Sequence, residues 1–321
     1  MREYGRFFLL AAVELFRMHR RRGYGLVQVH NPPDALVFCT LPLKLSGIPI
    51  ILDLRELTPE LFMSRFRWGR DSLAARALTF LERAACGYAD SALVLHERHR
   101  RIMISRHVPA DKLVQVMNCP DERLFDPAAC AGIQRQGEGF VIINHGGMME
   151  RYGVDLLVQA VARVRDQIPG VRLELYGTGD FLPHIEQLVR DLGLDDRVAF
   201  FGQRPLEQMP GAIAAADVGV APMRQDVFTD CGLPTKLLEY VAMSVPAIAS
   251  RTATTAEYFD DSMVYYFRTG DVEDLADKLL AVYRDRPGAA ARATRARRFT
   301  ETHNWSTERA NYLALVRRLT A

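Results

Sequence analysis

Glycines and charged side chains follow the first strand expected in the second half of the chain, and their types suit an anionic ligand. The strand ends at Asn144, and Gly146, Gly147 and Arg151 come directly after it. Two glycines let a backbone approach a phosphate closely, and an arginine brings a fixed fork of donors to the same place. The sequence therefore predicts a diphosphate site here, with a plain strand-to-helix turn as the alternative.

A second segment with suitable chemistry reads DCGLPTKLLEY over residues 230–240. Pro234 and Thr235 mark the start of a helix, and Lys236 in its first turn suits a diphosphate. Glu239 lies one turn beyond Lys236 on the same face, where a carboxylate can accept both hydroxyls of a ribose. The alternative is an exposed Lys–Glu pair on a helix surface.

Two further glycine turns follow expected strands. Gly177 lies in YGTGD, an incomplete dinucleotide fingerprint on a strand that is not the first of its domain, so a nicotinamide-dependent dehydrogenase is not favoured. Gly202 lies in FFGQR, a turn of small residues where a flat base can lie against the backbone.

These residues need a scaffold, and the sequence provides strands and helices in alternation, which implies parallel sheets covered by helices on both faces. After a helix over residues 1–22, the first half is expected to contain strands at 26–30, 48–53, 92–95 and 113–117 and helices at 71–88 and 97–107. The second half is expected to contain strands at 140–144, 171–176, 198–201, 218–221, 247–249 and 264–267, and helices at 153–168, 180–192, 206–215, 235–243, 271–285, 289–302 and 305–319.

The composition narrows the class of protein. With 321 residues, 49% hydrophobic and 25% charged, the chain suits two globular domains and is neither disordered nor fibrous. A net charge of +2 gives no general attraction to nucleic acid, so no nucleic-acid partner is expected. Five scattered cysteines without a C-x-x-C pair exclude a disulfide framework or zinc module and fit a reducing cytoplasm.

Arginines gather at three places in the first third of the chain, within residues 17–22, 65–70 and 98–106. Each cluster alone is typical of a solvated helix end. Three of them together favour contact with phosphates or with an anionic membrane surface.

Taken together, these features resemble retaining glycosyltransferases of family 4, which have the two-domain GT-B fold. In the second half the similarity is carried by HGGMMERYGVDLLVQAVARV, VRLELYGTGD, RVAFFGQRP, AADVGVAPM, GLPTKLLEYVAMSVPAIAS and GDVEDLADKL, in family order. In the first half it is carried by VQVHNPPD, IILDLRELTPEL, SALVLHERH and KLVQVMNCPDERLFDP, so the resemblance covers residues 26–320.

The resemblance implies an α/β fold of two Rossmann-like domains: a shortened acceptor-side domain over 1–130, a nucleotide-sugar donor domain over 131–304, and a helix over 305–321 that packs back toward the first domain. It also implies sugar transfer from a nucleotide diphosphate sugar of UDP or GDP type, with retention and without a metal ion or other cofactor. The expected nucleotide-sugar-binding residues are Gly146, Gly147, Arg151, Gly177, Gly202, Lys236, Leu238 and Glu239.

The chain departs from the family pattern in the donor half. Gly147 and Tyr152 stand where the family usually has an Arg and a Lys, so Arg151, supported by Lys236, is the expected substitute. Cys231 aligns with the first carboxylate of the family's paired-glutamate motif. A small shift places Asp230 or Asp226 there, and Asp230 is the expected carboxylate at the transferred sugar.

In the first half, Asp53-Leu54-Arg55-Glu56 stands where the family usually reads D-x-H-D, so Arg55 replaces the histidine. Arginine stays protonated and cannot act as a base, but the resemblance implies front-face attack assisted by the leaving phosphate. Arg55 is then expected to stabilise the departing diphosphate, and the alternative is that it only pairs with Glu56 or Glu60. The expected acceptor-side residues are His30, Asp53, Glu56 and Glu60; for His30, capping of a loop is the alternative.

Family members begin with roughly two more βα units than this chain shows. Either a true N-terminus is missing, or another polypeptide supplies those strands, or the activity is lost. We expect a hexosyltransferase of surface polysaccharide or glycoconjugate synthesis, cytoplasmic and peripheral on the inner face of the membrane, with a glycan or polyprenyl-linked acceptor. The alternative is a non-catalytic or obligately paired nucleotide-sugar-binding subunit whose N-terminal domain is completed by a protein partner.

Overall fold

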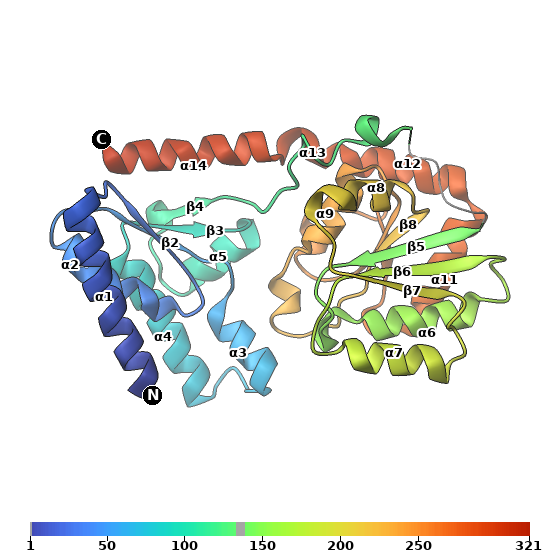
Figure 1. The fold of residues 1–321 in the computed structure, drawn as a ribbon, viewed down its shortest axis with the longest axis horizontal. Coiled ribbons are helices and arrows are strands. Elements are labelled where there is room, and N and C mark those ends of the chain that lie inside the picture. The colour runs from blue at the N-terminus through green and yellow to red at the C-terminus, as the bar shows by residue number, and fades with distance from the viewer. Residues whose placement is uncertain (1, 133–138) are drawn as a thin grey trace. The chain divides into compact units, whose positions relative to one another are not determined.

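The computed structural model describes residues 2–132 and 139–321, which form two compact units, each built on a parallel sheet (Figure 1). The first unit comprises Met1–Asn118 with Ser306–Ala321, and the second comprises Cys119–Trp305. The expected boundary at residue 130 is therefore too late, because the 3₁₀ helix Pro127–Cys130 packs against α8 (Met209–Ala214) of the second unit. Of the expected linker at 126–139, residues 133–138 lie outside the described residues.

The first unit contains a four-stranded parallel sheet in the order β1-β2-β3-β4. Its strands are β1 Val27–His30, β2 Ile50–Asp53, β3 Ser91–Val94 and β4 Leu113–Gln115. The register pairs His30 with Asp53, so these two polar residues end neighbouring strands side by side. The helices are α1 Arg2–Arg22, α2 Leu41–Lys44, α3 Thr58–Phe66, α4 Leu73–Tyr88 and α5 Glu97–Ser105, with 3₁₀ helices at Asp34–Thr40 and Ala110–Lys112.

The last helix, α14 (Trp305–Thr320), completes the first unit rather than the second. Leu315 packs with Ile51 and Leu93 of the first sheet. The Tyr312 hydroxyl donates to Gln28 Oε1 at 2.6 Å, and Glu308 accepts a hydrogen bond from a backbone amide near the end of the same sheet. Apolar and polar contacts together hold the end of the chain on strands formed near its beginning.

The second unit contains a six-stranded parallel sheet in the order β10-β9-β8-β5-β6-β7. Its strands are β5 Phe140–His145, β6 Val171–Tyr176, β7 Val198–Gly202, β8 Val218–Ala221, β9 Ala247–Ser250 and β10 Tyr265–Phe267. The first strand, β5, lies in the middle, and the chain winds outward from it in both directions. In such a sheet, ligands bind at the carboxyl ends of the strands where the winding direction reverses.

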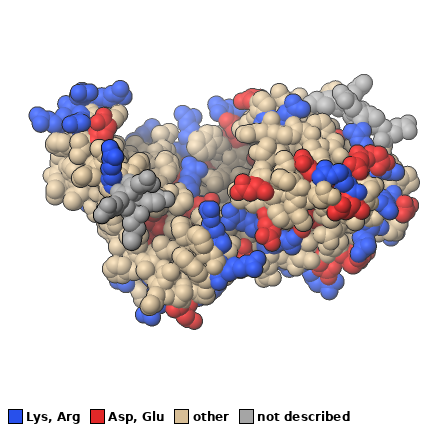
Figure 2. All heavy atoms as spheres, turned by 60° about the horizontal axis from the view of Figure 1, so that its bottom comes forward, with Lys and Arg blue, Asp and Glu red and all other residues tan. Residues whose placement is uncertain are grey.

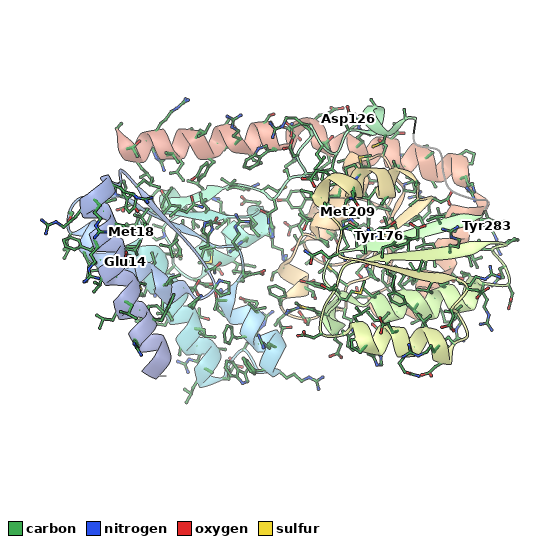
Figure 3. The ribbon with its side chains drawn as sticks, viewed as in Figure 1. Glu14, Met18, Asp126, Tyr176, Met209 and Tyr283 are labelled. Atoms are coloured by element: carbon green, nitrogen blue, oxygen red, sulfur yellow. The ribbon has the colours of Figure 1, made fainter. Side chains whose placement is uncertain are left out.

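Helices cover both faces of the second sheet (Figure 1). One face packs on α6 (Val154–Val164), α7 (Leu182–Asp191) and α11 (Val272–Arg284), where Tyr283 meets Phe140 edge-on at 5.5 Å (Figure 3). On the other face α9 (Thr235–Ala242) places Tyr240 on Gly219 of β8, so closely that a β-carbon at Gly219 would lie 2.4 Å from the ring. The remaining helices are α10 Thr255–Tyr258, α12 Arg286–Arg297 and α13 Phe299–Thr302, with 3₁₀ helices at Glu150–Tyr152, Leu206–Gln208 and Thr229–Cys231.

All ten expected strands form, each within two residues of its expected bounds. Several short helical segments were not expected, among them the 3₁₀ helix Asp34–Thr40 with α2, then α3, then α10. The expected helix at 206–215 begins as a 3₁₀ turn before α8, and the expected helix at 289–302 is divided into α12 and α13. These segments are short or irregular, so they carry little helical periodicity.

One expected acceptor-side residue, Glu60, lies instead inside the first unit. Its side chain is 8% exposed and pairs with Arg106, which also pairs with the fully buried Glu82. Burial raises the pKa of Glu82 to about 8, with the charge of Arg106 acting in the opposite direction. The structure therefore corrects the assignment of Glu60: this carboxylate joins α3 to α4 and α5 through Arg106.

Replacing Arg106 with methionine is expected to destabilise the first unit by about 3–5 kcal/mol, because Glu60 and Glu82 would be left buried without their cation. Urea unfolding can follow this unit alone in a Trp305→Phe background, where Trp68 is the only tryptophan left. Arg17→Met is the matched control, since Arg17 and Glu14 are exposed, and it should cost about 1 kcal/mol or less. Equal midpoints for the two variants would show that the buried pairs do not stabilise the unit.

Candidate functional site

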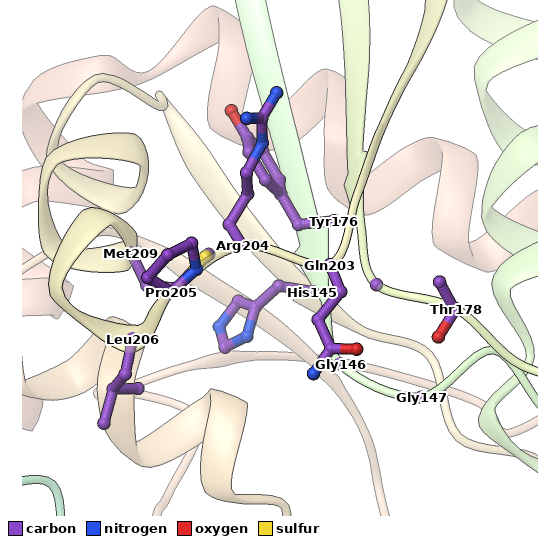
Figure 4. Close-up of a pocket in the computed structure, with 11 residues that line it drawn as sticks. His145, Gly146, Gly147, Tyr176, Thr178, Gln203, Arg204, Pro205, Leu206 and Met209 are labelled. Atoms are coloured by element: carbon purple, nitrogen blue, oxygen red, sulfur yellow. The ribbon is translucent and has the colours of Figure 1, made fainter.

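An open pocket of about 560 Å³ lies at the carboxyl ends of β5, β6 and β7 in the second unit (Figure 4). The His145 ring projects into it, with Thr178 and Gln203 on one side and Pro205 and Leu206 on the other. Tyr176, at the end of β6, and Met209, at the start of α8, also line the pocket (Figures 3 and 4). The lining residues are His145, Gly146, Gly147, Tyr176, Gly177, Thr178, Gln203, Arg204, Pro205, Leu206 and Met209.

Two of the expected glycines make this pocket by bringing neighbouring loops into backbone contact. Gly146 and Gly177 have φ of +108° and +129°, and a β-carbon on Gly177 would lie 1.9 Å from the carbonyl oxygen of Gly146. The Gly146 amide donates to Tyr176 O at 2.9 Å, and the Gly177 amide donates to Gly202 O at 2.8 Å. The structure thus brings together Gly146, Gly177 and Gly202, as the sequence predicts.

Tyr152 lies beside the loop that contains Gly146 and Gly147, called the glycine loop below. Two cations from different elements lie near the ring of Tyr152. A β-carbon on Gly147 would meet the Tyr152 ring at 3.2 Å. The guanidinium carbon of Arg151 lies 5.7 Å and the ammonium of Lys236 5.6 Å from the centre of that ring. The loop after β5 and the first turn of α9 therefore bring two positive charges to one aromatic side chain.

Arg151 lacks a carboxylate partner among the described residues. Its guanidinium packs over Phe228 at 5.2 Å and one terminal nitrogen contacts Met149 Sδ at 3.2 Å, while the buried Nε makes no hydrogen bond. The neighbouring Asp155 is already paired with Arg224. A cation with an unused buried donor is suited to an anionic ligand.

Lys236 is the second cation, and it too forms no ion pair with a described carboxylate. Its ammonium would be 3.7 Å from a β-carbon on Gly146, so it lies directly beside the glycine loop. Burial lowers the pKa of Lys236 to about 8, while the charge of Glu239 acts in the opposite direction. A bound anion would favour the protonated lysine and raise this pKa again.

Glu239 of α9 and His145 at the end of β5 are in contact beside the glycine loop. The Nε2 atom of His145 lies 3.1 Å from Oε2 of Glu239, yet Nε2 makes no hydrogen bond, because the two groups are close without being aligned. Burial raises the pKa of Glu239 to about 7, partly offset by Lys236. Burial, and to a lesser extent the charge of Lys236, lowers the pKa of His145 to about 3, so the imidazole is neutral.

Three other residues that the sequence predicts to bind the nucleotide sugar or its sugar are engaged within the second unit. The Leu238 side chain is 1% exposed in the core, so it is not available to a ligand. Asp230 uses Oδ1 to accept from the Ala253 amide at 2.9 Å, and Asp226 accepts from the amides of Phe228 and Thr229. Both aspartates therefore stabilise loops of the second unit.

In the first unit, the carboxyl ends of β1 and β2 carry a separate polar cluster around Asp53. The Oδ2 atom of Asp53 lies 2.8 Å from His30 Nδ1 and accepts from Gln28 Nε2 at 3.0 Å and from Arg55 Nε at 3.1 Å. The side chains of His30 and Arg55 are about half exposed. The predicted His30, Asp53 and Arg55 thus form one group, in which Arg55 is paired with Asp53.

Sequence reasoning missed Asn31, which organises the loop next to this cluster. Its Oδ1 accepts from the amides of Arg55 and Glu56, and its Nδ2 donates to Asp34 and to the Glu56 carbonyl. Glu56, predicted on the acceptor side, is half-buried in this loop. Sequence reasoning also assigned no role to His145, whose only signal was its place between a buried strand and two glycines.

Two general properties of the described chain bear on the chemistry. Within residues 2–132 and 139–321, no three His, Cys, Asp or Glu side chains are grouped so that they could hold a metal ion. Among the helices of these same residues, none is long and apolar enough to cross a membrane.

Both halves match known protein families. Residues 2–119 match the family described as "Glycosyl transferase 4-like domain", and residues 139–285 match "Glycosyl transferases group 1". The two matches coincide with the two sheets described above.

Individual proteins similar to this chain are also named as sugar transferases. A GDP-mannose-dependent alpha-(1-6)-phosphatidylinositol monomannoside mannosyltransferase of Mycobacterium tuberculosis is 30% identical over 197 residues, 57% of this chain and 49% of that protein. The sulfoquinovosyl transferase SQD2 of Arabidopsis thaliana is 24% identical over 289 residues, 86% of this chain and 53% of that protein. The chain thus spans about half the length of these curated relatives.

Solved structures have the same fold. The Anabaena protein HepE, crystallised with UDP, aligns with a TM-score of 0.77 at 16% identity, covering 96% of this chain and 82% of that one. A sucrose-phosphate synthase from Thermosynechococcus elongatus aligns with a TM-score of 0.76 at 22% identity, covering 96% and 77%. The chain belongs to the family 4 glycosyltransferases and has their GT-B fold.

Proposed function

We propose that this chain transfers a hexose-type sugar, with retention, from a nucleotide diphosphate sugar of UDP or GDP type to a glycan or lipid-linked acceptor in surface polysaccharide or glycoconjugate synthesis. One observation carries the proposal: Arg151 and Lys236, neither paired with a described carboxylate, flank the glycine loop of the second unit beside Glu239. The mannosyltransferase relative uses GDP-mannose and the Anabaena structure contains UDP, which supports both nucleotide types equally.

In this proposal the second unit binds the donor. The diphosphate lies at Gly146 and Gly147, where the Gly147 amide and the two cations neutralise it without a metal ion, since the Gly146 amide already donates to Tyr176 O. Glu239 accepts the two ribose hydroxyls. The base lies in the pocket between the loop at 202–206 and the ring of His145.

The chemical step needs charge stabilisation more than a protein base. As the bond from the sugar to the diphosphate breaks, negative charge builds on the phosphate oxygens, and preorganised cations lower the barrier. Lys236 and Arg151 supply this charge from the donor side, and Arg55 is proposed to add to it. Asp53 holds the Arg55 side chain and orients it, while the leaving phosphate takes the proton of the attacking hydroxyl.

Membrane association is proposed as well, through α1 of the first unit. Phe7, Leu9, Leu10, Val13 and Phe16 are large apolar side chains that this helix exposes. The last turn contains His19, Arg20, Arg21 and Arg22, and Figure 2 shows basic side chains gathered where α1 ends. Exposed apolar side chains next to arginines suit a membrane surface containing anionic lipids.

Glu239→Ala is expected to weaken binding of UDP or GDP by about 1.5–3 kcal/mol for each lost hydrogen bond to the carboxylate. Isothermal titration with both nucleotides measures this loss. Glu273→Ala is the matched control: Glu273 lies on α11 in an exposed pair with Arg163 of α6, and this variant should bind like the unchanged chain. If Glu239→Ala folds and binds with full affinity, Glu239 does not contact the ribose.

Lys236→Met and Arg151→Met are expected to reduce affinity for the nucleoside diphosphate strongly and for the nucleoside hardly at all. Because the pKa of Lys236 is about 8 in the empty pocket, affinity for a nucleotide sugar should also fall above pH 8, and Lys236→Arg should remove this decline. Lys278→Met, which removes a partly exposed lysine that pairs with Asp274 on α11, is the control. Equal losses for nucleoside and diphosphate would place both cations away from the phosphates.

Replacing Arg20–Arg22 with glutamine is expected to reduce binding to phosphatidylglycerol vesicles by about a hundredfold, since each arginine contributes about 1 kcal/mol at an anionic surface. Vesicle flotation at low salt measures this, with phosphatidylcholine vesicles for comparison. Removing Arg163, Arg165 and Arg190 from the second unit takes away the same charge and should have little effect. Equal losses for the two triple variants would mean that net charge alone, and not α1, drives binding.

A further inference from the structure

His145 is held in a defined position at the end of β5. Its backbone pairs with Tyr176 in the parallel ladder, and its ring packs edge-on against Tyr240, with ring centres 5.2 Å apart and planes at 89°. Tyr240 is itself fully buried against Gly219. Strand and helix therefore fix where the imidazole nitrogens lie.

The imidazole has a buried nitrogen, Nε2, that has no hydrogen-bond partner among the described residues. Nε2 is buried without a hydrogen bond, although the Oε2 atom of Glu239 is only 3.1 Å away. A buried polar group without a partner is costly, and a small rotation of the Glu239 carboxylate would align the two atoms. The arrangement favours any state in which Glu239 turns to accept from Nε2–H.

We infer that His145 is a positioning residue for Glu239: its Nε2–H holds one carboxylate oxygen so that the remaining acceptor sites face the two ribose hydroxyls of the donor. This inference rests on the proposed function, because it assumes that Glu239 binds the ribose. In this role His145 does not need to touch the ribose itself, because it acts by orienting the Glu239 carboxylate that binds the ribose.

The charged and titratable groups around the pair support this role. Glu239 faces His145 from β5 and Lys236 and Tyr240 from its own helix, and His145 faces the same lysine and tyrosine. Lys236 lies beside Gly146 and Tyr152 and affects Glu239 only through its charge, whereas Nε2 of His145 is within contact distance. His145 stays neutral because burial holds its pKa near 3, so it can donate from Nε2 without carrying a charge.

Two substitutions separate the donor from the shape of the ring. His145→Phe keeps an aromatic ring against Tyr240 but removes the nitrogen, and His145→Gln keeps an N–H donor at the position of Nε2 but removes the ring. Titration calorimetry with UDP and GDP, each beside its 2′,3′-dideoxy counterpart, reports on the ribose hydroxyls alone. Glu239→Gln is included as the reference for loss of the carboxylate.

The expected result is a loss of about tenfold or more in affinity of His145→Phe for the ribonucleotide, with dideoxynucleotide affinity within about twofold of the unchanged chain. His145→Gln should recover most of the loss. Because Glu239 must be ionised to accept two hydroxyls, ribonucleotide affinity should fall as the pH drops below about 7, the pKa of Glu239 in the empty pocket. Without the donor the carboxylate is harder to ionise, so in His145→Phe this decline should begin at higher pH.

Three outcomes decide the matter. If Glu239→Gln leaves the ratio of ribonucleotide to dideoxynucleotide affinity unchanged, the proposed role of Glu239 itself is wrong. If Glu239→Gln lowers this ratio while His145→Phe weakens both ligands equally, His145 is only part of the pocket wall and the inference is overturned. If His145→Phe does not fold, two other measurements decide. The inference is contradicted if His145→Gln has a ratio of ribonucleotide to dideoxynucleotide affinity as low as that of Glu239→Gln. It is also contradicted if the ribonucleotide affinity of the unchanged chain is flat between pH 6 and 8.

Discussion

The pocket of the second unit depends on the close approach of two backbones at the carboxyl ends of β5 and β6. His145 and Tyr176 stand opposite each other in the ladder, so the loops that follow start at the same level. The carbonyl of Gly146 then occupies the space where a side chain on residue 177 would have to be. This contact holds the loop after β5 against the loop after β6, and Gly146 and Gly177 both line the pocket. The positions of Tyr152 and Lys236 follow from it, because both pack directly against the loop.

The electrostatics of the pocket follow from which carboxylates are already engaged. Asp155 pairs with Arg224, while Asp226 and Asp230 accept backbone amides. The two cations beside the glycine loop are thus left without ionic partners among the described residues, in a place where burial has already lowered the pKa of the lysine. Burying a positive charge without a partner costs hydration energy, so an anionic ligand compensates for more of this cost here than it would at an open surface.

The sequence predicts the strands of both sheets and the residue types at several strand ends and helix starts, but not how those residues are buried or paired. The buried strand 140–145 begins with four consecutive apolar residues, which a sequence pattern can recognise, whereas α10 is four residues long and has no periodicity to read. Gly146, Gly177, Lys236 and Glu239 could be found because strand ends and helix starts are local signals. The partners of Glu60 and Asp230 could not, because Arg106 and Ala253 come from distant parts of the chain and only the folded structure brings them together. Burial is also what moves the pKa of His145 and Glu239, and a sequence pattern does not give it.

The packing of α14 gives the first unit an unusual dependence on synthesis order. Gln28 and Tyr312 are 284 residues apart and share a hydrogen bond, and Leu315 covers Ile51 and Leu93 of the same sheet. As the chain leaves the ribosome, the four strands of the first unit appear long before the helix that covers them, and the whole second unit must emerge in between. The apolar side chains under α14 are exposed throughout this interval, and the second unit can reach its native state first. The order of domains along the chain is therefore the reverse of the order in which they can be completed.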